Sequence, residues 1–196
     1  MTDRARTRLF AAAIGVVAAV VVVGSGFLIA DAIDDTPDPD GSFVLEEPGV
    51  FQQPFDDVNA DSSGRRLPDS PLTDATGTEH RFTDLRGKPL VVNLWFSNCV
   101  PCRRELRDFA TVHHEVGDAV QFVGVNPFDT VDAMERFAAE RGVSYLLWRD
   151  EQRLLTNDLG VVGYPVTLFV SADGEILRQT GEIDAAGLRA AIEELF

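Results

Sequence analysis

Residues 89–102 have the sequence Pro-Leu-Val-Val-Asn-Leu-Trp-Phe-Ser-Asn-Cys-Val-Pro-Cys, in which an apolar run is followed by the only two cysteines of the chain. The nearly continuous aliphatic and aromatic run 89–96 is typical of a strand that is buried on both faces of a parallel sheet. From Arg103 to Val116 apolar side chains recur at helical spacing, which predicts an amphipathic helix. The cysteine pair therefore lies where a central strand ends and a helix begins.

This position favours redox chemistry at Cys99. Pro101 fits the first turn of a helix, where its missing N–H removes a donor that has no partner within the helix. The unpaired N–H groups and the dipole at a helix N-terminus stabilise negative charge, and hence a thiolate. We therefore expect Cys99 to be the nucleophile of a Cys99–Cys102 dithiol.

A structural disulfide and a zinc site are the alternatives to catalysis at the cysteine pair. Closing so short a loop would stabilise the fold by only about 2 kcal/mol on the chain-entropy model. A structural zinc site needs four ligands, and His113 and His114 are adjacent rather than three to five residues apart. The strand-to-helix context favours catalysis over both.

The rest of the sequence after residue 66 predicts alternating strands and helices. A hairpin is expected over residues 67–82, and the later segments are strands at 120–125, 145–148 and 166–170, helices at 131–141 (capped near Asp129) and 152–159, a turn at 172–174, and a last helix that ends at Phe196. The strand–helix–strand–helix order predicts parallel pairing. The glycines match neither a nucleotide fingerprint nor a phosphate loop.

Five short motifs resemble the thioredoxin superfamily, and most closely its membrane-anchored TlpA/ResA/CcmG-like thiol-disulfide oxidoreductases. The motifs are 84–89 (DLRGKP), 92–95 (VNLW), 99–105 (CVPCRRE), 122–126 (FVGVN) and 163–167 (GYPVT), and the resemblance extends from residue 67 to residue 196. It implies an α/β, thioredoxin-like fold with a central mixed β-sheet flanked by helices. It also implies that electrons pass through the dithiol itself, with no metal, nucleotide or flavin cofactor.

The resemblance also assigns roles near the cysteines. Cys99 would form a mixed disulfide with a partner protein, and Cys102 would resolve it. Glu105 matches an acid that ResA-like proteins keep near the active site, so it could exchange protons with Cys102; the alternative is a carboxylate that favours the helix dipole and is neutralised by neighbouring arginines. Asn93 stands where thioredoxin has a buried acid, which removes one possible proton acceptor.

Three further residues are expected to bind substrate. Pro165 matches the family's cis-proline opposite the cysteines, although X-Pro bonds in folded proteins are cis in only about 5–6% of cases, so the local sequence favours trans. Tyr164 would contact an extended substrate beside it, or would simply line the cleft as a half-exposed aromatic residue. Trp95 would flank the active site, with plain core packing as the alternative.

The N-terminal residues predict a membrane anchor. Residues 9–30 carry no charge and would form a helix of about 33 Å, which is enough to span a bilayer. Three arginines precede this segment and five aspartates follow it closely, so residues 1–8 are expected in the cytoplasm and the rest outside the membrane. The alternative is a cleaved signal peptide, for which Ala30-Asp31-Ala32 offers a site.

An acidic tether is expected between the anchor and a thioredoxin-like domain at residues 65–196. Residues 31–64 contain ten acidic residues, several prolines and no lysine or arginine, in a chain whose formal net charge is −15. This composition predicts an extended, hydrated segment and argues against nucleic-acid partners. A purely solvated tether does not explain the three aromatic side chains of this segment, which are Phe43, Phe51 and Phe55.

Together these features predict a single-pass membrane protein whose extracytoplasmic domain is a thiol-disulfide oxidoreductase. Its partners would be protein thiols or disulfides and a membrane electron donor or reoxidant. The resemblance favours a reductase of partner proteins, in cytochrome c maturation. The alternatives are a thiol oxidase of secreted proteins, or a tethered binding or chaperone module without redox turnover.

Overall fold

The computed structural model describes residues 58–196. The expected anchor at 9–30, the three tether phenylalanines and most of the expected tether lie outside the described residues. Among residues 58–196, no helix combines the length and the apolar character needed to cross a bilayer.

A seven-stranded mixed sheet forms the centre of the described domain, in the order β2-β1-β5-β4-β3-β6-β7. The strands are β1 (Leu72–Thr73), β2 (Glu79–His80), β3 (Leu90–Leu94), β4 (Gln121–Asn126), β5 (Leu146–Arg149), β6 (Val166–Val170) and β7 (Ile176–Thr180). Strands β3, β4 and β5 are parallel, whereas β6 pairs with β3 in the antiparallel direction. The expected mixed sheet, and the hairpin of β1 and β2, are thus confirmed.

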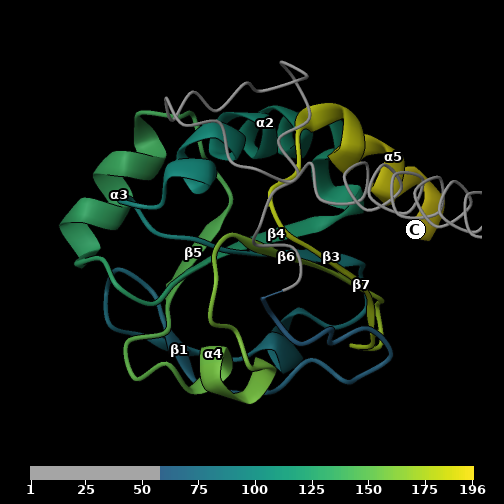
Figure 1. Ribbon diagram of the computed structural model, residues 1–196, viewed down its shortest axis with the longest axis horizontal. Coiled ribbons are helices and arrows are strands. Elements are labelled where there is room, and N and C mark those ends of the chain that lie inside the picture. Colours follow the sequence, from purple (N-terminus) through teal and green to yellow (C-terminus); the bar gives the residue numbers. More distant parts are fainter. Residues whose placement is uncertain (1–57) are drawn as a thin grey trace, which may run out of the picture. The chain divides into compact units, whose positions relative to one another are not determined.

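Helices cover both faces of this sheet (Figure 1). The helical segments are η1 (Phe82–Leu85), α2 (Val100–Val116), η2 (Gly117–Ala119), α3 (Val131–Ala139), α4 (Leu154–Leu159) and α5 (Ala185–Leu195). Apolar side chains of α2 and α5 pack on one face, and those of α4 and η1 pack on the other. Helix α3 lies on the same face as α2, because Phe137 shares a cluster with Leu106.

Alternation along β3 decides which side chains approach the cysteines. Val92 and Leu94 face α4, whereas Val91 faces α2 and α5. Because side chains alternate along a strand, Asn93 and Trp95 point to the same face as Val91, beneath the start of α2. The central strand is buried along its whole length, as the apolar run predicts.

The domain begins earlier than the boundary expected at residue 65. The side chain of Asn59 accepts hydrogen bonds from the amides of Val162 and Gly163, at 2.7 and 2.9 Å, and donates one to the carbonyl of Gly163. The backbone N–H of Gly64 donates to the carbonyl of Ile176, and Ser62 is buried. Residues 58–64, assigned from composition to the tether, therefore pack on the domain.

Candidate active site

The two cysteines form a disulfide at the first turn of α2. Cys99 is the N-cap residue of the helix, and its Sγ accepts a hydrogen bond of 3.2 Å from the backbone N–H of Cys102. Cys99 keeps 6% of its surface exposed, whereas Cys102 has none. Only Cys99 can therefore be reached first by a large partner, as the motif predicts.

Asp129 holds the loop that leads into Cys99. Its carboxylate accepts hydrogen bonds from the backbone N–H and the hydroxyl of Ser97, both at 2.7 Å, and from the side chain of Asn126. The sequence instead suggested Asp129 as a helix cap; the cap of α3 is Thr130, whose hydroxyl accepts from the amide of Ala133. The sequence did contain a signal for the contact between Ser97 and Asp129. Both are polar residues that follow predicted parallel strands, and the carboxyl ends of neighbouring parallel strands meet at one edge of the sheet.

Glu105 is buried on the face of α2 that covers the sheet, with only 2% of its surface exposed. Its Oε1 accepts a hydrogen bond of 2.8 Å from Asn93 Nδ2, and its Oε2 accepts one of 3.2 Å from the backbone N–H of Ile183. Burial raises the pKa of Glu105 to about 8, although the two hydrogen bonds oppose the shift. The carboxyl is thus held in conditions that favour its protonated form at neutral pH.

The alternative in which surface arginines neutralise Glu105 is wrong. Arg104 points instead to Glu182, with its Nε 2.6 Å from Glu182 Oε1. The physical reason is the helical period, which directs Glu105 inward beside Leu106 and leaves Arg103 and Arg104 at the surface.

Asn93 and Glu105 together form a buried polar pair. Residue 93 carries no acid, but its amide contacts one that is supplied by α2. Asn93 Oδ1 is buried and has no hydrogen-bond partner among the described residues. A half-turn of the amide would present this oxygen to a protonated Glu105, so the pair can be hydrogen-bonded in both protonation states.

Glu105 also lies on a route between the cysteines and solvent. It follows Cys102 by three residues on α2, which places the two side chains on neighbouring positions of the helix surface. On its other side it lines a surface cavity of about 450 Å³, together with Asp108, Glu182 and Asp184. A proton held by Glu105 can therefore be exchanged with solvent without passing through the apolar core.

Trp95 packs beneath the disulfide. It has no exposed surface, shares a cluster with both cysteines, and stacks on Phe137 with the ring centroids 5.7 Å apart. A side chain that is completely covered cannot contact a docked protein. Trp95 thus lies beside both cysteines, as the expected flanking position requires, but its burial argues against a direct contact with substrate.

The Tyr164–Pro165 peptide bond is cis, as the resemblance implies and against the preference of the local sequence. Tyr164 is half-buried and packs against the cysteine cluster. Its ring also contacts Phe96 and Phe128, with both centroids at 5.5 Å, and about half of Phe128 is exposed. Pro165 is itself buried, so a partner could reach this loop through its backbone, through Tyr164 and through the exposed side chain of Val162.

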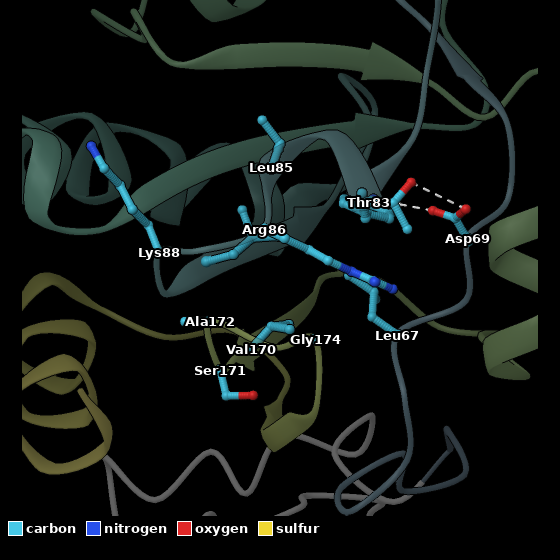
Figure 2. A pocket seen from close by; sticks show the side chains of 12 residues that line it. Leu67, Asp69, Thr83, Leu85, Arg86, Lys88, Val170, Ser171, Ala172 and Gly174 are labelled. Carbon is cyan, nitrogen blue, oxygen red and sulfur yellow. Dashed lines mark hydrogen bonds between the residues drawn. The ribbon is translucent and has the colours of Figure 1, made fainter.

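A second hollow lies at the opposite end of β3 and cannot hold a substrate. It is lined by Leu90 and Val170 and by the segment before β3, where Asp69 accepts hydrogen bonds from Thr83 (Figure 2). Its volume of about 20 Å³ has room for roughly one water molecule. Among residues 58–196, no group of three or more histidine, cysteine or carboxylate side chains is placed to hold a metal ion.

Comparison with known proteins agrees with this geometry. The family model described as the AhpC/TSA family matches residues 63–180. The chain belongs to the AhpC/TSA family. The thiol-disulfide oxidoreductase ResA of Geobacillus thermodenitrificans is 28% identical to this chain over 150 residues, which cover 74% of this chain and 85% of ResA.

Another relative and one solved structure are also similar to this chain. The thiol:disulfide interchange protein HelX of Rhodobacter capsulatus is 36% identical over 135 residues, or 66% of this chain and 75% of HelX. A secreted Mycobacterium tuberculosis disulfide oxidoreductase, homologous to E. coli DsbE, superposes with a TM-score of 0.58 over 65% of this chain and 96% of that one. At 24% identity, this structure shows the shared fold. The resemblance to TlpA/ResA/CcmG-like proteins is confirmed.

Proposed function

We propose that this protein is an extracytoplasmic thiol-disulfide oxidoreductase that reduces disulfide bonds in partner proteins. The observation that carries the proposal is a disulfide at a helix N-terminus whose first cysteine keeps 6% of its surface exposed and whose second has none. The resemblance to CcmG-like proteins supports cytochrome c maturation as the process that it serves, and the uncharged segment 9–30 supports a membrane anchor.

The reaction transfers two electrons from the dithiol to the partner. The Cys99 thiolate attacks one sulfur of the partner disulfide, forms a mixed disulfide with it, and releases the other partner sulfur as a thiolate. Cys102 then loses its proton and attacks Cys99 Sγ, which releases the second partner sulfur. The products are a reduced partner, which takes up two protons, and the Cys99–Cys102 disulfide; a separate dithiol protein must reduce that disulfide again.

In its ionised form, Glu105 has the position to accept the Cys102 proton during the second step; at neutral pH, where the protonated form predominates, it must first release its own proton to solvent. It neighbours Cys102 on α2, and its pKa of about 8 is close to the ordinary value of a thiol, about 8.5. Proton transfer is efficient when donor and acceptor are matched in this way. Asn93 fixes the carboxyl through its 2.8 Å hydrogen bond and is a positioning residue.

Trapping the intermediate tests the assignment of the two sulfurs. The reduced full-length chain with Cys102→Ser should accumulate a covalent adduct with a disulfide-containing protein such as insulin. Wild type should reduce insulin without accumulating the adduct. Cys99→Ser should do neither. An adduct that forms with Cys99→Ser but not with Cys102→Ser would reverse the roles.

The reduction potential of the full-length chain tests the direction of transfer. A reductase in an oxidising compartment should have a potential more negative than about −200 mV, whereas a strong oxidase lies near −120 mV. A value near the second figure would support oxidation of secreted proteins. If the variant without both cysteines still suppresses aggregation of an unfolded protein, and wild type transfers no electrons, the chain is a binding module.

A further inference from the structure

A narrow groove runs beside the accessible cysteine, between the start of α2 and helix α3. Its volume is about 180 Å³, and its walls are Ser97, Asn98, Arg103, Ala133, Arg136, Phe137, Glu140 and Arg141. Ser97 and Asn98 directly precede Cys99 in the chain. The groove therefore begins next to the sulfur that meets the partner.

The groove is positively charged in a strongly acidic protein. Three arginines line it against a single carboxylate, that of Glu140. Within residues 58–196, Arg103 and Arg136 form no ion pair, and Arg141 pairs only with Glu140, at 3.5 Å, while its Nη1 also donates a hydrogen bond of 3.0 Å to the carbonyl of Phe137. Some arginines elsewhere in this domain are bound closely to carboxylates, as Arg189 is to Glu115 at 2.6 Å, whereas others, such as Arg86 and Arg107, form no ion pair among the described residues.

Phe137 holds two of the guanidinium groups close together. The Cζ atom of Arg141 lies 3.4 Å from the centre of the Phe137 ring, and that of Arg103 lies 5.6 Å from it. The Nε of Arg141 is buried and has no hydrogen-bond partner among the described residues. Burial, and next the charge of Arg103, lower the pKa of Arg141. Three positive charges are thus held here with only the Glu140 carboxylate, 3.5 Å from Arg141, to balance them.

We propose that this arginine groove binds an acidic segment that flanks the disulfide of the partner protein. The inference rests on the proposed function, because only a partner joined to Cys99 must lay its neighbouring residues along the groove. Carboxylates suit guanidinium groups, since the two form paired, charge-assisted hydrogen bonds. The groove would then select, among many accessible disulfides, those that have aspartate or glutamate beside them.

Matched peptides provide the test. Three synthetic peptides share one intramolecular disulfide and differ only in two flanking residues, which are Glu, Gln or Lys. The reduced full-length chain is mixed with each peptide, and the rate of oxidation is followed by fluorescence, because Trp95 packs against the disulfide. At low ionic strength the Glu peptide should react roughly tenfold faster than the Gln peptide, and the Lys peptide more slowly. The difference should shrink in about 0.5 M NaCl, where screening is strong.

The decisive quantity is the ratio of the Glu to the Gln rate within each variant, which removes any change in the reactivity of Cys99 itself. This ratio should fall close to one in Arg103→Gln/Arg136→Gln. It should stay at the wild-type value in Arg189→Gln, which removes the same kind of charge near the far end of α2. A wild-type ratio of one, or a high ratio that survives in the double variant, would overturn the proposal. If none of the three peptides oxidises the reduced wild-type protein, the proposed function itself is wrong.

Discussion

Glu105 makes the stability of the domain depend on pH. Its pKa is about 8 in the folded protein against an ordinary value of 4.5, because burial disfavours the carboxylate. Between these two values the folded chain keeps a proton that the unfolded chain has released. The contribution of Glu105 to the free energy of unfolding is therefore fully present below pH 4.5. It is lost as the pH rises to 8, at up to about 1.4 kcal/mol per pH unit.

Replacing Glu105 by Gln should remove this pH dependence. The free energy of unfolding of oxidised Glu105→Gln, measured by urea titration, should change less between pH 4.5 and pH 8 than that of wild type. The free energy of unfolding of the variant should therefore rise relative to that of wild type as the pH increases. Glu115→Gln is the control, because Glu115 is exposed and its hydrogen bond with Arg189 lowers its pKa, the opposite direction to that of Glu105. Parallel curves for Glu105→Gln and wild type would contradict the buried acid.

At the scale of single elements, β4 approaches the active site through a glycine. A Cβ atom added at Gly124 would lie 2.7 Å from Trp95 Nε1 and 2.9 Å from Leu147 Cδ2. Both contacts are closer than van der Waals packing allows. Gly124 therefore leaves the space in which Trp95 supports the cysteine cluster.

Gly124→Ala should destabilise the domain by about 1–3 kcal/mol, the usual cost of overpacking a filled core. It should also shift the fluorescence of Trp95, because that ring must move. Urea unfolding and emission spectra measure the two effects. Gly163→Ala is the matched control, since its added Cβ would meet nothing nearer than 3.7 Å. Equal losses in the two variants would contradict the close approach of β4 to Trp95.

The segment before β1 fastens the loop that carries the cis-proline. Asn59 makes three hydrogen bonds to Val162 and Gly163. Asn59→Ala should therefore cost about 1–3 kcal/mol and speed hydrogen exchange at the two loop amides, because they lose their acceptor. Asp61→Ala, which removes a carboxylate bonded only to nearby Ser63, is the control. Unchanged protection of the Gly163 amide in Asn59→Ala would contradict this role.

The sequence predicted those parts of the site that depend on local pattern. The apolar run ending at Trp95 and the cysteines at a helix start were both recognised, because period and capping are properties of neighbouring residues. The contact of Glu105 with Ile183 and that of Ser97 with Asp129 were missed, since each joins elements that only the folded sheet brings together. The burial of Trp95 likewise depends on its contact with Phe137 in α3. No pattern of neighbouring residues in the sequence predicts that contact.

At the scale of the whole chain, we propose that residues 9–30 anchor the oxidoreductase domain to a membrane. Mature protein should retain residues 1–30 and stay with membranes after carbonate extraction, because burying some twenty apolar residues is effectively irreversible. Intact mass and fractionation are the measurements. A mature chain that begins at Asp31 or later would show that the segment is a cleaved signal peptide.

The hydrogen bond from the Ile183 amide to Glu105 provides an NMR probe of the active site from a residue that is distant in sequence. Ile183 lies just before α5, and its N–H donates to the carboxyl that neighbours Cys102 on α2. The chemical shift of this one amide should titrate with a midpoint near pH 8 in the oxidised protein and lose that titration in Glu105→Gln. The same peak, followed during turnover, would separate proton transfer at Glu105 from electron transfer at the sulfurs. An Ile183 shift that is flat from about pH 6 to about pH 9 would show that the carboxyl does not ionise in this range.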